Sequence, residues 1–183
     1  MGEAVNAPAL DHSELYPTNA DRGALMDVKI SPSTALHVDY IAANIRQADE
    51  QEIWDMALLK PREALSKAME VSDFVSTGFI NNQIVGMCGL VRISLLSEAG
   101  RPWMISTSAL DNKRYALDFH RMGKRVVAAM IGIFPYLENY VEASNTRTVR
   151  WLKALGFQFD QPQKMGPLMK PFVRFYMERN GIH

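Results

Sequence analysis

The stretch that most constrains the fold lies near the C-terminus, where a strand-like segment leads directly into a short helix with clear ends. Residues 136–144 read as a strand, and Asn145 then stands where its side-chain oxygen can accept a backbone N–H of a first helical turn. Apolar residues recur at helical spacing up to Gly156, a residue type that often ends helices in a left-handed conformation. Phe157 and Phe159 restart an alternating pattern. The stretch therefore predicts a strand, a capped helix and a second strand.

The spacing of five residues in this stretch carries a family resemblance. They are Asn145, Thr148, Leu152, Gly156 and Phe157. This spacing resembles the C-terminal half of the GNAT (Gcn5-related N-acetyltransferase) fold, which typically has Asn, Ala, Tyr, Gly and Phe there. In that family the Asn contacts the pantetheine arm of coenzyme A, and the Tyr often protonates the leaving thiolate. Leu152 cannot donate a proton, so the resemblance implies the fold more directly than the activity. A generic strand–helix–strand connection is the alternative.

The N-terminal half predicts a strand and then helices. Met26–Ile30 alternates like a strand, and Ser31-Pro32 is expected to end it. Apolar residues recur at helical spacing through Asp39–Met56, with a break near Ala48-Asp49 where Asp49 can cap a second helix. Pro61 suits the first turn of another helix. His37 and Asp39 are interpreted as capping groups.

A hairpin is predicted next. Residues 74–80 and 84–93 flank Asn81-Asn82-Gln83, and Asn tolerates the positive φ that tight hairpin turns require. Gly86 and Gly89 in the second strand indicate a bulge or a close backbone approach. Cys88 is interpreted as a buried structural thiol because no base lies near it in the sequence.

The remaining elements complete a predicted sheet. Trp103–Ser108 is expected to be the fourth strand, followed by a long helix through residues 115–133 that Pro135 ends. A helix joins this strand to residues 139–144, so the two are expected to run parallel. A last hairpin pairs residues 157–160 with 172–178. The fold class predicted is α/β (α+β): a GNAT-like mixed, mostly antiparallel sheet of six or seven strands with about four helices.

Composition sets the domain organisation and excludes several classes of protein. The 183 residues are enough for one domain, which we place at residues 25–183 after an extended N-terminal arm, residues 1–24. The formal net charge is zero, so nucleic acid is disfavoured as a partner, and no apolar run is long enough to span a membrane. The N-terminus lacks the features of a signal peptide, so synthesis in the cytoplasm is expected. A single cysteine excludes an internal disulfide.

The expected phosphate-binding turn of an acetyltransferase is missing. That family uses a glycine-rich turn between the fourth strand and its helix, whose backbone N–H groups close on a pyrophosphate. Residues 109–120 hold no glycine, and Asp111 would repel a phosphate. Lys113 and Arg114 are able to hold a phosphate as point charges, but a solvated helix face is the simpler interpretation. Arg147, Arg150 and Lys153 on the last helix, together with the basic face of the long helix, leave open a patch for nucleic acid or an acidic protein surface.

The candidate site residues are those that occupy cofactor-binding positions if the chain has the GNAT fold. Ser106, Thr107 and Asn145 line the expected coenzyme A wedge, and they are predicted to bind the cofactor only if coenzyme A is bound. Glu142, late in a strand beside the expected cleft, is the leading candidate for a general base. No catalytic residue is assigned from the sequence, and no metal site is predicted.

A narrower resemblance covers roughly residues 74–160. Trp103-Met-Ile-Ser-Thr, the long basic helix, Asn139-Tyr-Val, and Asn145 with Arg150-Trp-Leu-Lys are similar to GNAT-like internal virion proteins of short-tailed, T-odd-type phages. The resemblance implies a phage-encoded, non-catalytic virion or virion-assembly component that needs no cofactor. Its partners would be other virion proteins or further copies of itself, contacted through the arm. It would be made in the host cytoplasm and then found in the virion.

The alternative function is an acyl-CoA-dependent N-acetyltransferase that uses acetyl-CoA with an atypical phosphate-binding loop. Fold alone does not decide between the two.

Overall fold

The computed structural model describes residues 26–179. The α-helices are α1 (Ala35–Ala43), α2 (Gln47–Ala57), α3 (Pro61–Val71), α4 (Ala116–Ile133) and α5 (Thr146–Leu155). The strands are β1 (Val28–Pro32), β2 (Phe74–Ile80), β3 (Gln83–Arg92), β4 (Ala99–Ser106), β5 (Tyr136–Glu142), β6 (Gln158–Phe159), β7 (Gln163–Met165) and β8 (Lys170–Glu178). Two 3₁₀ turns, Ser108–Asp111 and Lys113–Tyr115, precede α4. The predicted arm, residues 1–24, lies outside the described residues.

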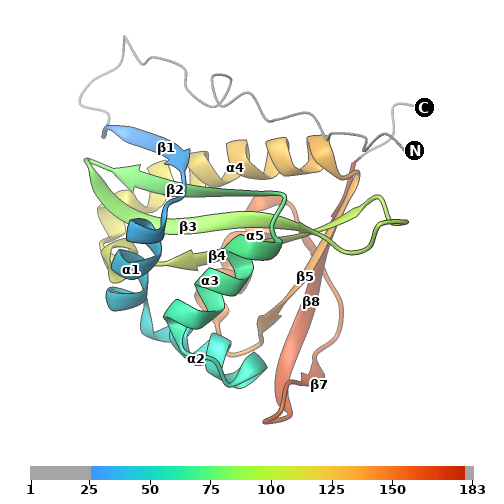
Figure 1. Ribbon diagram of the computed structural model, residues 1–183. Helices are drawn as coiled ribbons and strands as arrows, with labels where there is room; N and C mark the ends of the chain where they lie inside the picture. Colours follow the sequence, from blue (N-terminus) through green and yellow to red (C-terminus); the bar gives the residue numbers. More distant parts are fainter. Residues whose placement is uncertain (1–25, 180–183) are drawn as a thin grey trace, which may run out of the picture.

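All eight strands form one mixed sheet in the order β1-β2-β3-β4-β5-β8-β6, with β7 paired to β8 (Figure 1). Every pairing is antiparallel except that of β4 with β5, which is parallel. The predicted fold class and the parallel central pair are confirmed. The sheet has one more strand than expected, because the loop before β8 contributes the short β7, and there is one more α-helix.

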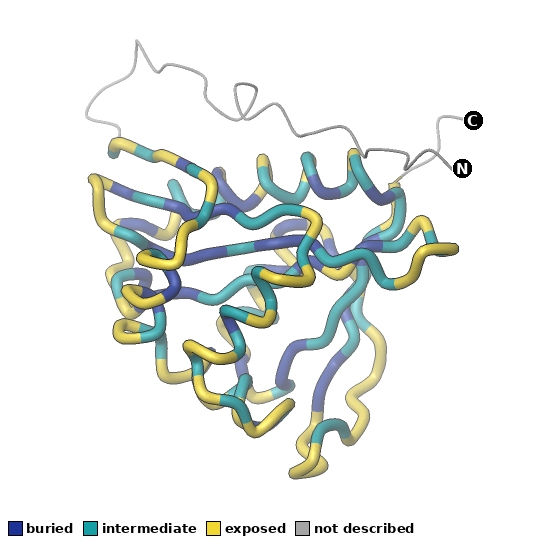
Figure 2. The backbone as a smooth tube through the Cα atoms, in the orientation of Figure 1, coloured by how far each residue is buried: buried dark blue, intermediate teal, exposed yellow. Residues whose placement is uncertain are grey.

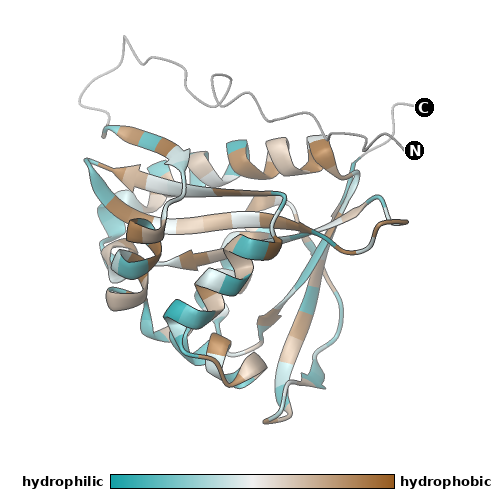
Figure 3. Cartoon of the chain, viewed as in Figure 1, coloured by the Kyte–Doolittle hydropathy of each residue, from teal (hydrophilic) through white to brown (hydrophobic). Residues whose placement is uncertain are grey.

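Helices cover both faces of the sheet (Figure 1). α1 and α3 pack on β3 from one side, and their cluster includes Ile41, Leu65 and Met87. α4 and α5 pack on the other side around Leu137 and Leu152. Figure 2 shows the buried residues concentrated on the central strands, and Figure 3 shows α3 with its hydrophilic residues outward. The sheet therefore lies between two helical layers, as amphipathic helices require.

The turns and caps confirm the local sequence signals. Asn81 and Asn82 have φ of 51° and 60°, and the β2–β3 register shifts next to Gly78, opposite Gly86, as a bulge does. Asn145 caps α5 by accepting a hydrogen bond from the Thr148 N–H, and Gly156 ends that helix at φ 102°.

The break between α1 and α2 lies earlier than predicted. α1 ends at Ala43 and α2 begins at Gln47, so the connection is residues 44–46 instead of Ala48-Asp49. His37 is a capping group: it completes a capping box with Thr34. The predictions for Asp39 and Asp49 were wrong. Asp39 pairs with Arg62 at 2.7 Å, and Asp49 does not cap a helix but bonds to groups outside α2.

Strand boundaries differ by a few residues from those predicted. β1 continues through Pro32, which is tolerated because β1 is an edge strand. β4 begins at Ala99, four residues before the predicted start. β5 ends at Glu142. Among residues 26–179 no helix has the length and apolarity to cross a membrane.

Candidate functional site

The site begins where two parallel strands separate. β5 pairs with β4 only at the start of each strand, through Ala99 with Tyr136 and Gly100 with Leu137. Beyond that point the two strands diverge, and the remainder of β4 up to Ser106 has no strand partner on this side among the described residues. The result is a wedge in the middle of the sheet.

Backbone groups of alternate β4 residues point into this wedge. The Thr107 N–H donates to the Val85 carbonyl on the β3 side at 3.0 Å, which fixes the alternation along β4. Pro102, Met104 and Ser106 therefore direct their backbone groups toward β5. The Pro102 carbonyl accepts a hydrogen bond from Asn139 Nδ2 at 2.8 Å, which closes the narrow end. Met104 presents its N–H and C=O to the wedge interior.

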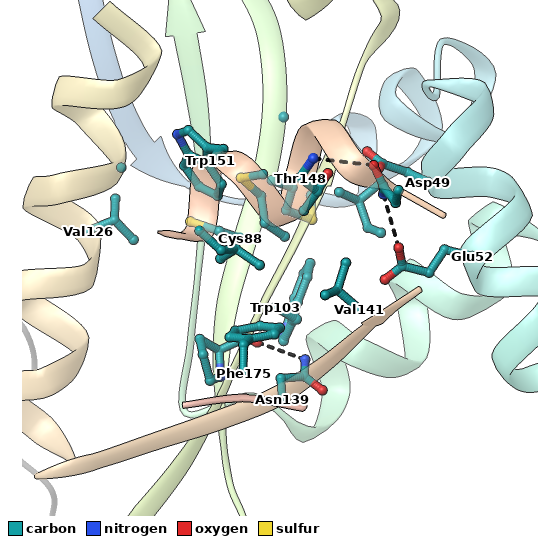
Figure 4. Close-up of a pocket in the computed structure, with 18 of the residues that line it drawn as sticks. Asp49, Glu52, Cys88, Trp103, Val126, Asn139, Val141, Thr148, Trp151 and Phe175 are labelled. Atoms are coloured by element: carbon teal, nitrogen blue, oxygen red, sulfur yellow. Dashed lines mark hydrogen bonds between the residues drawn. The ribbon is translucent and has the colours of Figure 1, made fainter. Parts of the chain in front are cut away.

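The wedge encloses a cavity of about 320 Å³ that extends to both faces of the sheet. Its walls are mainly apolar and come from β3, β4 and β5 and from the helices on either side. Figure 4 shows Cys88, Trp103, Val126, Val141, Trp151 and Phe175 around this space. Burial raises the pKa of the Cys88 thiol to about 12, so this thiol is not a nucleophile at neutral pH.

A carboxyl group lies at the polar end of the cavity. Glu52, on α2, accepts a hydrogen bond from Asn145 Nδ2 at 3.1 Å (Figure 4). Burial raises the pKa of Glu52 from 4.5 to about 7, the bond from Asn145 lowers it, and the charges of Asp49 and Glu142 raise it. A carboxyl group with a pKa near 7 beside a cavity has the properties of a general base at neutral pH.

The α1–α2 connection crosses the wide end of the wedge. The Arg46 N–H donates to the Ser106 carbonyl at 2.9 Å, and the Ser106 N–H donates to Asp49 Oδ2 at 2.8 Å. The Arg46 guanidinium bonds both to Asp49 at 2.5 Å and to Thr148 Oγ1, on α5, at 2.9 Å. An antiparallel bridge joins Ile45 to Thr107. The end of β4 is thereby tied to α5 through residues 45–49.

The turn between β4 and α4 uses its own backbone donors. The Leu110, Asn112 and Tyr115 N–H groups donate to carbonyls within the same turn. Arg147 of α5 pairs with Asp111 at 2.6 Å and also bonds to the Leu110 carbonyl. Asp111 is thus paired with a cation of α5, although its side chain is about half exposed.

The three predicted cofactor residues lie near one another but face different groups. Ser106 is buried, and its backbone is bound to Arg46 and Asp49. The Thr107 hydroxyl donates to the Ile84 carbonyl at 2.9 Å, toward β3. Asn145 is the one of the three that lines the cavity. Their role in binding coenzyme A stays a prediction.

Other predicted residues lie at the periphery of the site. Glu142 is buried, and its charge helps to raise the pKa of Glu52, so it borders the site without lining the cavity. Leu152 lines the cavity, as its position in the motif implies. Lys113 and Arg114 are exposed, and the Arg114 guanidinium lies 5.8 Å from the Tyr115 ring centre.

Sequence reasoning missed the residues of α2. Asp49, Glu52 and Met56 recur at three- and four-residue spacing beside Ile53, which places two carboxylates on the apolar face of one helix. This pattern could have identified α2 as part of the site from the sequence alone. Within residues 26–179 no group of three His, Cys, Asp or Glu side chains is arranged to hold a metal ion.

No protein-family model and no curated protein sequence matches this chain. Solved structures do. The spermidine N-acetyltransferase from Vibrio cholerae, in complex with CoA and spermine, matches with a TM-score of 0.64 and 11% identity, covering 83% of this chain and 95% of that one. A putative acetyltransferase from Salmonella typhimurium, with acetyl-CoA, matches with a TM-score of 0.60 and 14% identity, covering 86% and 96%.

A ribosomal-protein-alanine N-acetyltransferase from Brucella melitensis matches with a TM-score of 0.60 and 14% identity, covering 82% of this chain and 99% of that one. At such low identity the likeness concerns the backbone and not the activity. The wedge between β4 and β5 and these neighbours together show that this chain has the GNAT fold.

Proposed function

We propose that this chain transfers an acyl group from a coenzyme A thioester to an amine, as an acyl-CoA-dependent N-acetyltransferase. Two of the solved neighbours were determined with CoA or acetyl-CoA, which supports this function over a purely structural role. The phage resemblance gives a second candidate function.

The observation that carries the proposal is the position of Met104. Its N–H and C=O lie on a strand edge that β5 leaves unpaired, inside a cavity with apolar walls. A secondary amide offers the complementary acceptor and donor, in the geometry of an added strand. The pantetheine arm of coenzyme A contains two such amides, so this part of the site fits the group.

The phosphate end fits less well. The turn before α4 has no glycine, and its Leu110, Asn112 and Tyr115 N–H groups donate to carbonyls of the same turn. The groups available for a phosphate there are the exposed side chains of Lys113 and Arg114, with Arg147 if Asp111 releases it. Side-chain cations would replace the backbone donors that the family uses.

Glu52 is proposed as the general base. The acceptor arrives as an ammonium ion, and Glu52 takes one proton so that the nitrogen lone pair becomes free. A bound thioester supplies the activated carbonyl carbon. The C–N bond forms, the C–S bond breaks with its electron pair on sulfur, and the second nitrogen proton goes to that sulfur. The products are an amide and a thiol.

The test combines binding with turnover. Calorimetry with acetyl-CoA should give a measurable Kd, and transfer to an amine should be detectable by thiol release. Glu52→Gln should keep acetyl-CoA binding but lower kcat by about 10²–10⁴-fold. Glu50→Gln, exposed on the same helix, is the matched control and should behave as wild type. Absence of binding at millimolar acetyl-CoA would contradict the proposal.

The second candidate is a non-catalytic, phage-encoded virion or virion-assembly protein. The observation that favours it is the crossing of the wide end of the wedge by residues 45–49, together with the glycine-free turn. Such a protein would act through contacts with other virion proteins or with its own copies, and its location would be the virion. Isolation of the chain with purified phage particles, and no stabilisation by acetyl-CoA, would support this candidate over the enzyme.

A further inference from the structure

The cavity has a distinct half on the α2–α3 side of the sheet. Odd-numbered β4 residues point to this side, because Trp103 and Ile105 pack in the cluster that contains α1 and α3 residues. The remaining walls here come from α2 and α3: Glu52, Ile53, Met56, Ala57 and Ala64. Met104 and the α4–α5 residues form the opposite half. In a cavity that passes through the sheet, a donor arm paired with β4 leaves the α2–α3 half for the acceptor.

Trp103 forms a fixed aromatic wall of this half. Its Nε1–H donates to Ser72 Oγ at 2.9 Å, which sets the orientation of the ring. The ring also lies flat against Gly89, where a Cβ would be 2.7 Å from three of its atoms. A rigid indole face of this kind binds apolar bodies and, through its π electrons, nearby ammonium groups.

This half of the cavity offers one carboxyl group for binding an amine. Among the cavity-lining residues of the described chain the acids are Asp49 and Glu52. Asp49 is already bound to Arg46 and to the Ser106 N–H. Glu52 is the one of these two that is not already paired with a cation. Every additional cation of a ligand would lie in this half without a carboxylate partner, which is unfavourable because the ion loses its hydration.

We propose, on the basis of the function proposed above, that the acceptor is a primary amine with an apolar or aromatic body, and not a polyamine. The apolar body lies against Trp103, Ile53 and Met56, and the single amine points to Glu52. The acceptor class thus differs from the spermine seen with the Vibrio cholerae neighbour.

Two probes test the proposal: 2-phenylethylamine and spermidine. Acetyl transfer from acetyl-CoA should proceed with a kcat/KM at least tenfold higher for 2-phenylethylamine. Met56→Glu adds a carboxylate to the apolar wall and should reduce this ratio at least tenfold. Gln47→Glu adds the same charge to an exposed position of the same helix and should leave the ratio unchanged.

Direct titration of each amine, without acetyl-CoA, separates this inference from the proposed function. Tighter binding of 2-phenylethylamine than of spermidine, reduced at least fivefold in Trp103→Leu, would support the acceptor class even if acetyl-CoA did not bind. Equal or tighter binding of spermidine would overturn the acceptor class and would leave acetyl-CoA dependence intact. A wild-type ratio in Met56→Glu, with the fold verified by circular dichroism, would also overturn it.

Discussion

The carboxylate of Asp49 accepts a hydrogen bond from the backbone N–H of Ser106 at 2.8 Å, across 57 residues of sequence. The same carboxylate pairs with Arg46, and both side chains are about nine-tenths buried. The contact places a buried ion pair on the strand edge beside the cavity. The end of β4 is therefore held by α2 instead of by β5.

The contributions of Arg46 and Asp49 to the free energy of unfolding should be strongly coupled. Arg46→Met leaves the Asp49 charge buried without its partner and is expected to destabilise the protein by about 3–5 kcal/mol. Arg46→Met/Asp49→Asn removes the stranded charge while an amide oxygen still accepts from Ser106, so part of the stability should return. Urea unfolding of the wild type, both single variants and the double variant gives the coupling energy.

The exposed pair of Arg62 with Asp39 is the control for this cycle. Both side chains are largely in solvent, and Arg62→Met should cost less than about 1 kcal/mol. Additive effects of Arg46→Met and Asp49→Asn, within about 0.5 kcal/mol, would show that the buried pair is not coupled.

Much of the fold was predictable because its signals are local. Asn145 and Gly156 mark the two ends of α5, and Asn81-Asn82 marks the β2–β3 turn. Each of these residues acts on the backbone within about four positions, so the sequence alone is sufficient to recognise it. The parallel β4–β5 pair followed from the long helix between them.

The site was less predictable because its contacts are long-range. Glu52 meets Asn145 across 93 residues, and its raised pKa comes from burial that no local pattern states. The position of Asp49 before a helical period favours a helix cap, whereas in the fold a strand edge provides a buried N–H for it. Asp111 has the charge to repel a phosphate, and its pairing with Arg147 depends on how α5 packs beside the turn.

Two glycines in α4 should respond in opposite ways to alanine. At Gly123 a Cβ would lie 2.6 Å from the Trp151 ring, which is stacked on Phe119 and has little room to move. Gly123→Ala should destabilise the protein by roughly 1–3 kcal/mol through overpacking.

At Gly132 no atom of residues 26–179 outside the helix's own backbone lies within 4 Å of the point that a Cβ would occupy. Gly132→Ala should therefore stabilise the helix by about 0.5–1 kcal/mol. Thermal unfolding measures both; equal shifts would contradict the packing of Trp151 against α4.

Glu52 should make stability depend on pH. Because folding raises its pKa from 4.5 to about 7, the folded state favours the protonated carboxyl. The stabilisation that protonated Glu52 gives the folded state is complete below about pH 4.5 and is lost as the pH rises through 7. The free energy of unfolding should fall by about 3 kcal/mol at most over this range. Glu52→Gln should therefore be more stable than the wild type at pH 8 and similar at pH 4.5. Glu50→Gln, exposed on α2, should leave the free energy of unfolding unchanged at both pH values. If the stability of Glu52→Gln depended on pH in the same way as that of the wild type, the effect would belong to another group.

The pairing of Arg147 with Asp111 should limit the affinity for acetyl-CoA. Both side chains are about half exposed, so breaking the pair should cost less than about 1 kcal/mol of stability. Asp111→Asn frees the Arg147 guanidinium for a phosphate and removes a negative charge beside it, and it should tighten acetyl-CoA binding by roughly two- to tenfold. Arg147→Gln should weaken binding by a similar factor.

Asp118→Asn is the matched control: it makes the same charge change within α4, where Asp118 lies 3.6 Å from Arg121. Calorimetry at low and high salt compares the variants. An equal gain in Asp118→Asn would attribute the effect to net charge, and unchanged affinity in both Asp111→Asn and Arg147→Gln would exclude Arg147 as a phosphate ligand.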